Sequence, residues 1–163
     1  MTYDNKSLRD LSANVPYDFI YIIANTQKYG GGAIYNHYGI SISGNLHAAK
    51  VYVHEFGHLF LGLGDEYVEV GSSYNDMYPT NVEPWEANLT TLTNFNKKWK
   101  DMLDKDTPVP TTYDPQNPKK LGAYEGGGYV SKGVYRPRYD CLMNTLCGDD
   151  FCPVCIRAIK KQI

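Results

Sequence analysis

The sequence predicts an α+β fold, in which a few short strands precede one long helix and a loop-rich second half. The first observation is an aromatic and β-branched run at residues 17–24, which has the composition of a buried strand. The second is a set of apolar residues that recur at helical spacing over residues 46–61. The third is the irregular region 68–140, where most of the prolines lie. Its many Tyr and Trp side chains favour ordered loops over disorder.

The elements expected before the long helix are short. A Leu pattern in residues 5–14 indicates one or two helical turns, and the alternating segments 33–35 and 39–43 predict short strands that could lie at a sheet edge. Asn45 is the candidate N-cap of the long helix, and Gly62 is a candidate stop at its C-terminal end.

Two further helical patterns follow, at residues 93–103 and 153–163. We expect one domain over residues 1–163, with the sheet and long helix at about 17–67 and the loop-rich part with the C-terminal helix at 68–163. The polar start of the chain is consistent with either a trimmed N-terminus or a cytosolic start, because it has no apolar signal segment.

Composition excludes some classes of protein. The net charge of −2 argues against a nucleic-acid or anionic-membrane surface, which requires clustered Lys and Arg. No apolar run approaches the roughly 20 residues of a membrane-spanning helix. The 163 residues include 15 Tyr, 15 Gly and 9 Pro, which indicates a soluble, loop-rich and tyrosine-heavy chain.

The string His54-Glu55-Phe56-Gly57-His58 indicates a zinc site. The two histidines are four residues apart on the expected helix, so both imidazoles project from one face and can share one ion. Glu55 follows the first histidine and can act on a water molecule that zinc has acidified. The chemistry that this spacing favours is hydrolysis of a carbonyl compound with Glu55 as the catalytic general base.

Two residues are candidates for the third zinc ligand. In the extended motif of the metzincins, a glycine follows the second histidine and the third ligand comes three residues later. Here that glycine is Gly62, so Asp65 is the expected ligand, although one extra residue separates His58 from the glycine and Asp replaces the usual His. Carboxylate oxygens bind zinc readily, and Glu66 is the alternative ligand.

The chain resembles the bacterial IgA-peptidase family of zinc metallopeptidases over roughly residues 17–160. The similar segments lie in the same order along the chain and are more specific together than the metal motif alone. They are 29–32, 54–67, 83–84, 88–91, 98–100, 122–129, 133–137, 141–144 and 151–155.

The resemblance implies a metzincin-like fold, with a small twisted mixed sheet over the active-site helix, a loop-rich lower subdomain and a short C-terminal helix. It also implies a Met-turn, whose methionine lies beneath the zinc ligands, and Met143 is the candidate. Some metzincins place an oxyanion-stabilising tyrosine two residues after this methionine, where this chain has Thr145. Tyr129 and Tyr135 are then the alternatives for that role. Family members usually have more sequence before the first strand, so the chain looks trimmed.

The segment from Tyr124 to Tyr135 is the candidate wall of a substrate cleft. Its glycines would let a peptide backbone approach closely, and Tyr124, Tyr129 and Tyr135 would contact the substrate. The alternative interpretation, at least as good for any one tyrosine, is that the aromatic side chains form small cores under the loops.

All four cysteines lie within a short segment around the expected Met-turn. Their proximity indicates either two disulfides, which an exported protein favours, or a structural zinc site with four sulfur ligands. A redox-active Cys-x-x-Cys is the weakest reading, because no thioredoxin-like βαβ pattern surrounds it. The residues are Cys141, Cys147, Cys152 and Cys155.

The leading functional hypothesis is a zinc metalloendopeptidase that is secreted or attached to the cell surface, as the family's members typically are. It would act as a monomer on a protein or peptide, for example a host glycoprotein, with one catalytic Zn²⁺. Two alternatives stay open: a non-catalytic glycoprotein-binding module that keeps the zinc helix as a scaffold, and a zinc amidase for a non-protein amide. The intact Glu55 argues against the binding module. Cleavage of IgA does not follow from the resemblance, because subsites lie on variable loops.

Overall fold

The computed structural model describes residues 1–69, 71, 77–148 and 150–163. In this described part the fold is α+β, with three α-helices, a three-stranded sheet and a two-stranded sheet. The chain forms two compact units, Met1–Gly62 and Leu63–Ile163, whose boundary lies a few residues before the expected division at 67/68. That they make up one domain stays a prediction. Residues 70 and 72–76 of the expected loop region lie outside the described residues.

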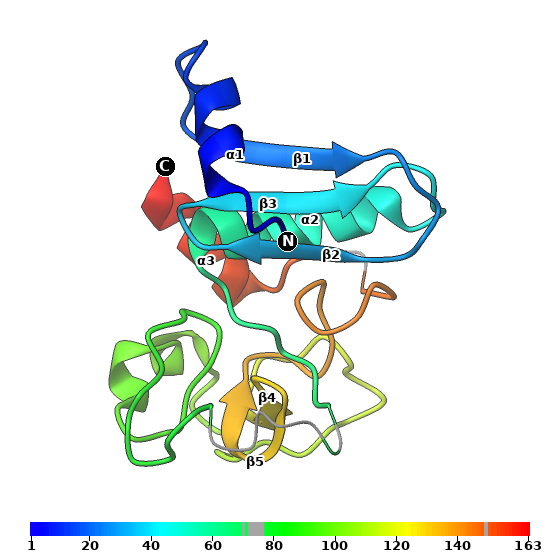
Figure 1. The fold of residues 1–163 in the computed structure, drawn as a ribbon. Coiled ribbons are helices and arrows are strands. Elements are labelled where there is room, and N and C mark those ends of the chain that lie inside the picture. Colours follow the sequence, from blue (N-terminus) through cyan, green and yellow to red (C-terminus); the bar gives the residue numbers. More distant parts are fainter. Residues whose placement is uncertain (70, 72–76, 149) are drawn as a thin grey trace. The chain divides into compact units, whose positions relative to one another are not determined.

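The first unit contains the three-stranded sheet (Figure 1). Its strands are β1 (Ile20–Ala24), β2 (Gly31–Ile34) and β3 (Tyr38–Ile42), in the spatial order β1-β3-β2. The central strand β3 pairs parallel with β1 and antiparallel with β2, so the sheet is mixed and β2 forms one edge. The short strands expected from the sequence are present, and β2, which includes residues 33 and 34, lies at an edge as expected. The segment 39–43 was also expected at an edge, but β3 is the central strand because it pairs with both neighbours. The run at 17–24 was expected to form a buried strand, but β1 lies at the other edge, and Ile20 is its one buried residue.

Helix α2 (Ala48–Leu61) packs against β3 and β2, with Val51 and Leu59 buried. It ends where expected, because Gly62 takes a left-handed conformation (φ 59°) and its N–H donates to two carbonyls of the last turn. Its start differs from the expectation. The N-cap is His47, and the Asn45 side chain instead accepts the backbone N–H of His47 at 2.9 Å, forming a turn before the helix.

The N-terminal helix α1 (Asn5–Ser12) also belongs to the first unit. The Asp4 carboxylate caps it by accepting the Ser7 backbone N–H at 2.9 Å. None of its residues is buried.

The second unit contains a buried hydrophobic cluster of Leu89, Val130 and Val134. Trp99 is also fully buried there, and its Nε1–H donates to the carbonyl of Gly122 at 2.6 Å. The expected helix over 93–103 is replaced by two 3-10 turns, η1 (Phe95–Lys97) and η2 (Lys100–Met102). The helix is interrupted because Lys98, between the two turns, has a non-helical backbone (φ −97°, ψ −118°).

Two strands and the last helix complete the second unit. Strands β4 (Tyr124–Gly127) and β5 (Val130–Arg136) form an antiparallel hairpin in the segment that the sequence assigns to loops. Helix α3 (Pro153–Gln162) starts at a proline, as helices often do, and confirms the expected C-terminal helix.

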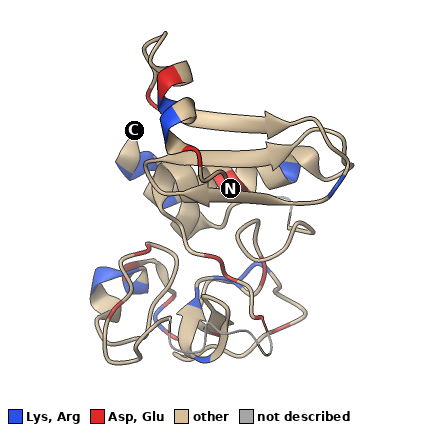
Figure 2. Cartoon of the chain, in the orientation of Figure 1, with Lys and Arg blue, Asp and Glu red and all other residues tan. Residues whose placement is uncertain are grey.

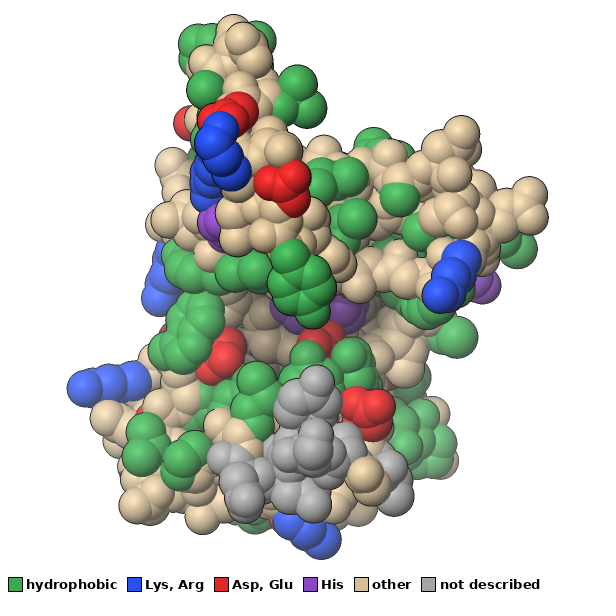
Figure 3. Space-filling model, viewed as in Figure 1, with side chains coloured by type: hydrophobic (Ala, Val, Ile, Leu, Met, Phe, Trp, Pro, Cys, Tyr) green, Lys and Arg blue, Asp and Glu red, His purple; other side chains and the backbone are tan. Residues whose placement is uncertain are grey.

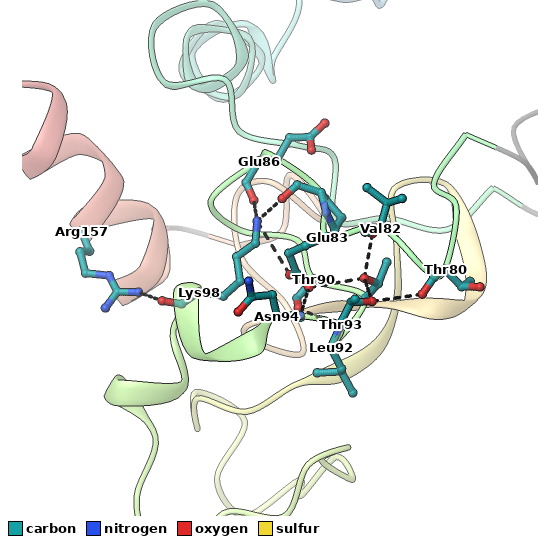
Figure 4. Close-up of polar contacts among 12 residues, drawn as sticks. Thr80, Val82, Glu83, Glu86, Thr90, Leu92, Thr93, Asn94, Lys98 and Arg157 are labelled. Atoms are coloured by element: carbon teal, nitrogen blue, oxygen red, sulfur yellow. Dashed lines mark hydrogen bonds and ion pairs between the residues drawn. The ribbon is translucent and has the colours of Figure 1, made fainter.

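Lys98 organises the loops of this unit through polar contacts (Figure 4). Its ammonium group donates to the carbonyl oxygens of Pro84 and Glu86, and Arg157 of α3 donates to the carbonyl of Lys98. Burial lowers the pKa of Lys98, although the Glu83 and Glu86 carboxylates oppose the shift. The order of this region therefore depends on side-chain-to-backbone hydrogen bonds more than on regular structure.

Acidic and basic residues both occur along the ribbon of each unit (Figure 2). Exposed hydrophobic side chains are also visible on both units (Figure 3), and Leu11, Ile23 and Trp85 are among the most exposed. Among the described residues, no helix combines the length and apolar character needed to cross a bilayer.

Candidate metal centre

The two histidines of the metal motif lie on one face of α2, as their spacing predicts. Their Nε2 atoms are 3.1 Å apart, and the two rings meet edge to face with centroids 4.8 Å apart. Both side chains are partly buried. Two imidazole nitrogens at this separation, His54 and His58, are placed to share one ion.

Glu55 lies on the same helix and is buried against the edge strand β2. A Cβ added at Gly31 would lie 2.6 Å from its Oε1 atom and 2.7 Å from Val51 Cγ1. A side chain at position 31 would therefore displace the carboxylate. In the sequence, Gly31 stands out only as part of segment 29–32, which resembles the IgA-peptidase family. That it leaves room for the Glu55 carboxylate could not be predicted from the sequence.

Asp65 belongs to the second unit, where it is buried. The Tyr129 hydroxyl donates a hydrogen bond to Asp65 Oδ2, and the Asp65 backbone carbonyl accepts the Gly128 N–H at 2.8 Å. Burial raises the pKa of Tyr129, and the Asp65 carboxylate raises it further. The phenol therefore stays protonated and keeps donating to Asp65.

The family of the chain follows from a comparison with known proteins. The family model for IgA peptidase M64 matches residues 1–117 and 113–163, which together span the chain. The chain belongs to this family. Members of the IgA peptidase M64 family are generally zinc-dependent, and the assignment makes the chain a protein-cleaving hydrolase. No curated protein matches the chain.

Glu66 was the alternative third ligand, but in this IgA peptidase M64 chain both its oxygens have other partners. Oε1 accepts a hydrogen bond from Asn88 Nδ2 at 2.9 Å, and Oε2 accepts one from Cys141 Sγ at 3.1 Å. The carboxylate is fully buried, and this burial raises the pKa of Glu66 well above its ordinary value. Glu66 is therefore held beside Asn88 and Cys141, and Asp65 stays the expected third ligand of the histidine pair.

Asn88 is a structural residue of the site that the sequence did not reveal. Its fully buried amide donates to the carbonyl of Gly64 and accepts the Gly64 backbone N–H, both at 2.8 Å. It thereby fixes the backbone one residue before Asp65. A lone Asn in a loop carries no sequence signal for such a role.

Met143 is fully buried in a hydrogen-bonded turn. The N–H groups of Asn144 and Thr145 donate to the carbonyl of Cys141 at 2.8 and 3.1 Å, and the Met143 carbonyl accepts the Glu66 N–H at 2.7 Å. The turn therefore contacts the segment that carries Asp65. Its position beneath a metal stays a prediction.

The three candidate substrate tyrosines differ in their surroundings. Tyr124 is buried and donates to the carbonyl of Lys120 at 3.1 Å, which favours the small-core interpretation for this residue. Tyr135 pairs through its backbone with Thr90. Tyr129, with its hydroxyl on Asp65, is the one of the three that contacts a predicted metal ligand.

The cysteines depart from the preferred expectation of two disulfides. All four are free, and Cys147 is exposed whereas the other three are buried. The Sγ atoms of Cys152 and Cys155 are 3.6 Å apart, well beyond the roughly 2.05 Å of a disulfide bond. The four-sulfur alternative is also not formed. Cys147 lies outside the group, and Glu66 occupies the fourth place beside Cys141, Cys152 and Cys155.

Proposed function

We propose that the chain is a zinc-dependent endopeptidase that hydrolyses peptide bonds with Glu55 as general base. The observation that carries this proposal is the 3.1 Å separation of the His54 and His58 Nε2 atoms on α2, with Glu55 between them in sequence. Membership of the IgA peptidase M64 family supports the peptidase class.

The donor set fits zinc. Two nitrogens bound at about 2.05 Å in a tetrahedron lie about 3.3 Å apart, close to the separation of the two histidines. Asp65 follows the helix stop Gly62 by three residues, so the chain itself limits its distance from the helix end to about 10 Å. We therefore assign Asp65 as the third ligand. A zinc ion held by these residues supplies positive charge that acidifies water and polarises a peptide carbonyl.

Glu55 performs the proton transfers in this proposal. Its carboxylate accepts the proton of the attacking water and then donates it to the nitrogen of the leaving amine. Its burial against Gly31 of β2 keeps the carboxylate in one place, which a positioned base requires.

Tyr129 is a positioning residue for Asp65. Its hydroxyl donates a hydrogen bond to Asp65 Oδ2 and so orients the carboxylate, as hydrogen-bond partners of metal ligands commonly do. We propose that the turn at Met143 is the Met-turn of a metzincin-like peptidase. The Met143 carbonyl accepts the backbone N–H of Glu66, the residue next to Asp65, and so supports the segment that carries the proposed ligand.

The proposed substrate is an extended segment of a protein, and the proposed location is outside the producing cell or on its surface. A surface-exposed enzyme would be labelled on intact cells by a reagent that does not cross membranes, and a secreted one would be recovered from the medium. Recovery only inside the cells would contradict this location.

The test of the function is turnover of a mixed peptide library by the zinc-loaded protein and by Glu55→Gln. The loss of a general base lowers activity by about 10²–10⁴-fold, while the two histidines keep binding zinc. A chelator should abolish cleavage by the wild-type protein and added zinc should restore it.

The control is the zinc content of Glu55→Gln, measured on the same sample by elemental analysis. Full activity in a zinc-loaded Glu55→Gln variant would contradict the mechanism. Absence of cleavage by the zinc-loaded wild-type protein across the library would contradict the endopeptidase assignment.

A further inference from the structure

A second group of metal-ligating side chains lies entirely within the second unit. Glu66, Cys141, Cys152 and Cys155 each offer one ligand atom, and these four atoms lie within 4.8 Å of one another. All four residues have no exposed surface. They come from three separate segments: the stretch after α2, the turn at Met143, and the start of α3.

The distances match those around a tetrahedral metal ion. Two sulfurs bound to zinc at about 2.3 Å lie about 3.8 Å apart, and the Cys152 and Cys155 Sγ atoms are separated by 3.6 Å. A sulfur and a carboxylate oxygen on the same ion lie about 3.6 Å apart. Cys141 Sγ lies 3.1 Å from Glu66 Oε2, and Cys155 Sγ lies 3.7 Å from the other oxygen, Oε1, so a thiol sulfur lies near each oxygen of the carboxylate.

The local sequence also suits metal binding. Cys152 is the N-cap of α3 and Cys155 lies in its first turn, so the two-residue spacing directs both sulfurs to one point. Asn88 donates to Glu66 Oε1 at 2.9 Å and orients the carboxylate, as hydrogen-bond partners of metal ligands commonly do.

Two buried arginines offset the negative charge that the metal-bound cluster would carry. A divalent ion with three thiolates and one carboxylate has a formal charge of about −2, which is costly to bury without cations nearby. Arg136 and Arg138 are both buried in this unit. The Arg136 guanidinium interacts electrostatically with Glu66 and Cys141, and that of Arg138 with Cys141 and Cys152.

We propose that Glu66, Cys141, Cys152 and Cys155 bind a structural divalent metal ion, with zinc the best match to three sulfurs and one oxygen. All four positions of the tetrahedron are filled by protein, so the ion has no open position for substrate. It would join α3, the turn at Met143 and the segment that contains Asp65. The site does not depend on the proposed peptidase mechanism, because it shares no ligand with the histidine pair.

The test uses Co²⁺ in place of zinc in the full chain. Thiolate-bound Co²⁺ absorbs strongly in the near ultraviolet by sulfur-to-metal charge transfer, which histidine and carboxylate ligands do not produce. We expect this absorption in the wild-type protein and in the matched control Cys147→Ser, whose thiol is exposed and outside the cluster. In Cys152→Ser we expect this absorption to disappear and the metal content to fall by about one ion per chain.

The absence of charge-transfer absorption from the reduced, folded wild-type protein would overturn the proposal. An unchanged spectrum in Cys152→Ser would do so as well. Charge-transfer absorption in a protein that holds one ion and cleaves no peptide would support this site while contradicting the proposed function. The two proposals can therefore fail separately.

A measurement on the wild-type protein covers the case in which Cys152→Ser does not fold. Titration of the zinc-loaded protein with an organic mercurial should release about one zinc ion per chain as the thiols react. No zinc release would overturn the site. Recovery of only two reactive thiols after denaturation without reductant would overturn it too, because it would identify a disulfide.

Discussion

The two units of this protein are stabilised in different ways. In the first, backbone ladders join β1, β3 and β2, and α2 packs across two of these strands. In the second, a hairpin and α3 lie among long loops, and single side chains such as Trp99 and Lys98 connect loops that are far apart in sequence. Periodic sequence patterns therefore predict the helix and strands of the first unit, whereas in the second they predict α3 but not the loop contacts, which have no period. The following predictions test this contrast.

The largest effect is expected from Trp99→Ala. The side chain is fully buried and its indole N–H donates to Gly122, so truncation leaves a cavity and an unpaired carbonyl. Such a change costs about 3–5 kcal/mol in the free energy of unfolding. Chemical denaturation followed by circular dichroism measures it. Trp85→Ala is the matched control, because this side chain is 65% exposed. Equal losses in the two variants would show that the second unit does not depend on single buried anchors.

An intermediate effect is expected from Gly31→Ala in the first unit. The added methyl would meet Glu55 Oε1 at 2.6 Å and displace the carboxylate, and a misplacement of about 1 Å can lower activity by about 10²-fold. The measurement is the peptidase kcat/KM, with circular dichroism to show that the sheet persists. Gly30→Ala is the control, because a Cβ there meets nothing within 4 Å. If both variants kept wild-type activity, the close packing of Glu55 on β2 would have no role in catalysis.

The smallest effect is expected from Asp150→Asn. The hydrogen bond from Arg138 holds the pKa of Asp150 below its ordinary value of 3.8. A carboxyl whose pKa is lower in the folded state stabilises the protein above its unfolded pKa, and this contribution disappears as pH falls through the folded value. Because Asp150 is largely solvated, we expect a loss of no more than about 1 kcal/mol at pH 7.

Melting temperatures of the wild-type protein and Asp150→Asn over pH 2–7 measure this difference. The two curves should converge at the acid end. A difference that grew toward low pH would contradict the assigned direction of the pKa shift.

Much of the first unit could be predicted from the sequence. The β-branched run located β1, the apolar spacing located α2, and Gly62 ended the helix as expected. The hairpin of β4 and β5 was missed, because its strands contain glycines and the tight turn between them depends on positive φ angles at Gly128 and Tyr129. Such conformations depend on tertiary contacts that a one-dimensional pattern does not contain.

The residues of the candidate metal sites also differ in whether the sequence alone could group them. His54 and His58 could be paired from helical spacing alone, because the helix geometry fixes their separation. Glu66 could not be grouped with the cysteines, since it reaches Cys141 and Cys155 from a segment more than seventy residues earlier. The sequence instead favoured Cys147, which is near the others along the chain but exposed in the structure.

The adjacent carboxylates of Asp65 and Glu66 place a strict limit on the length of the segment that carries them. Within the second unit Asp65 meets Tyr129, whereas Glu66 meets Asn88 and Cys141. Deleting one residue between Gly62 and Asp65 would bring Glu66 to the position of Asp65, and inserting one would bring Asp65 to the position of Glu66, so in each case one of the two positions would lose its carboxylate. Substitutions elsewhere in this short segment alter one contact at a time, whereas a change in its length would disturb both proposed metal sites at once.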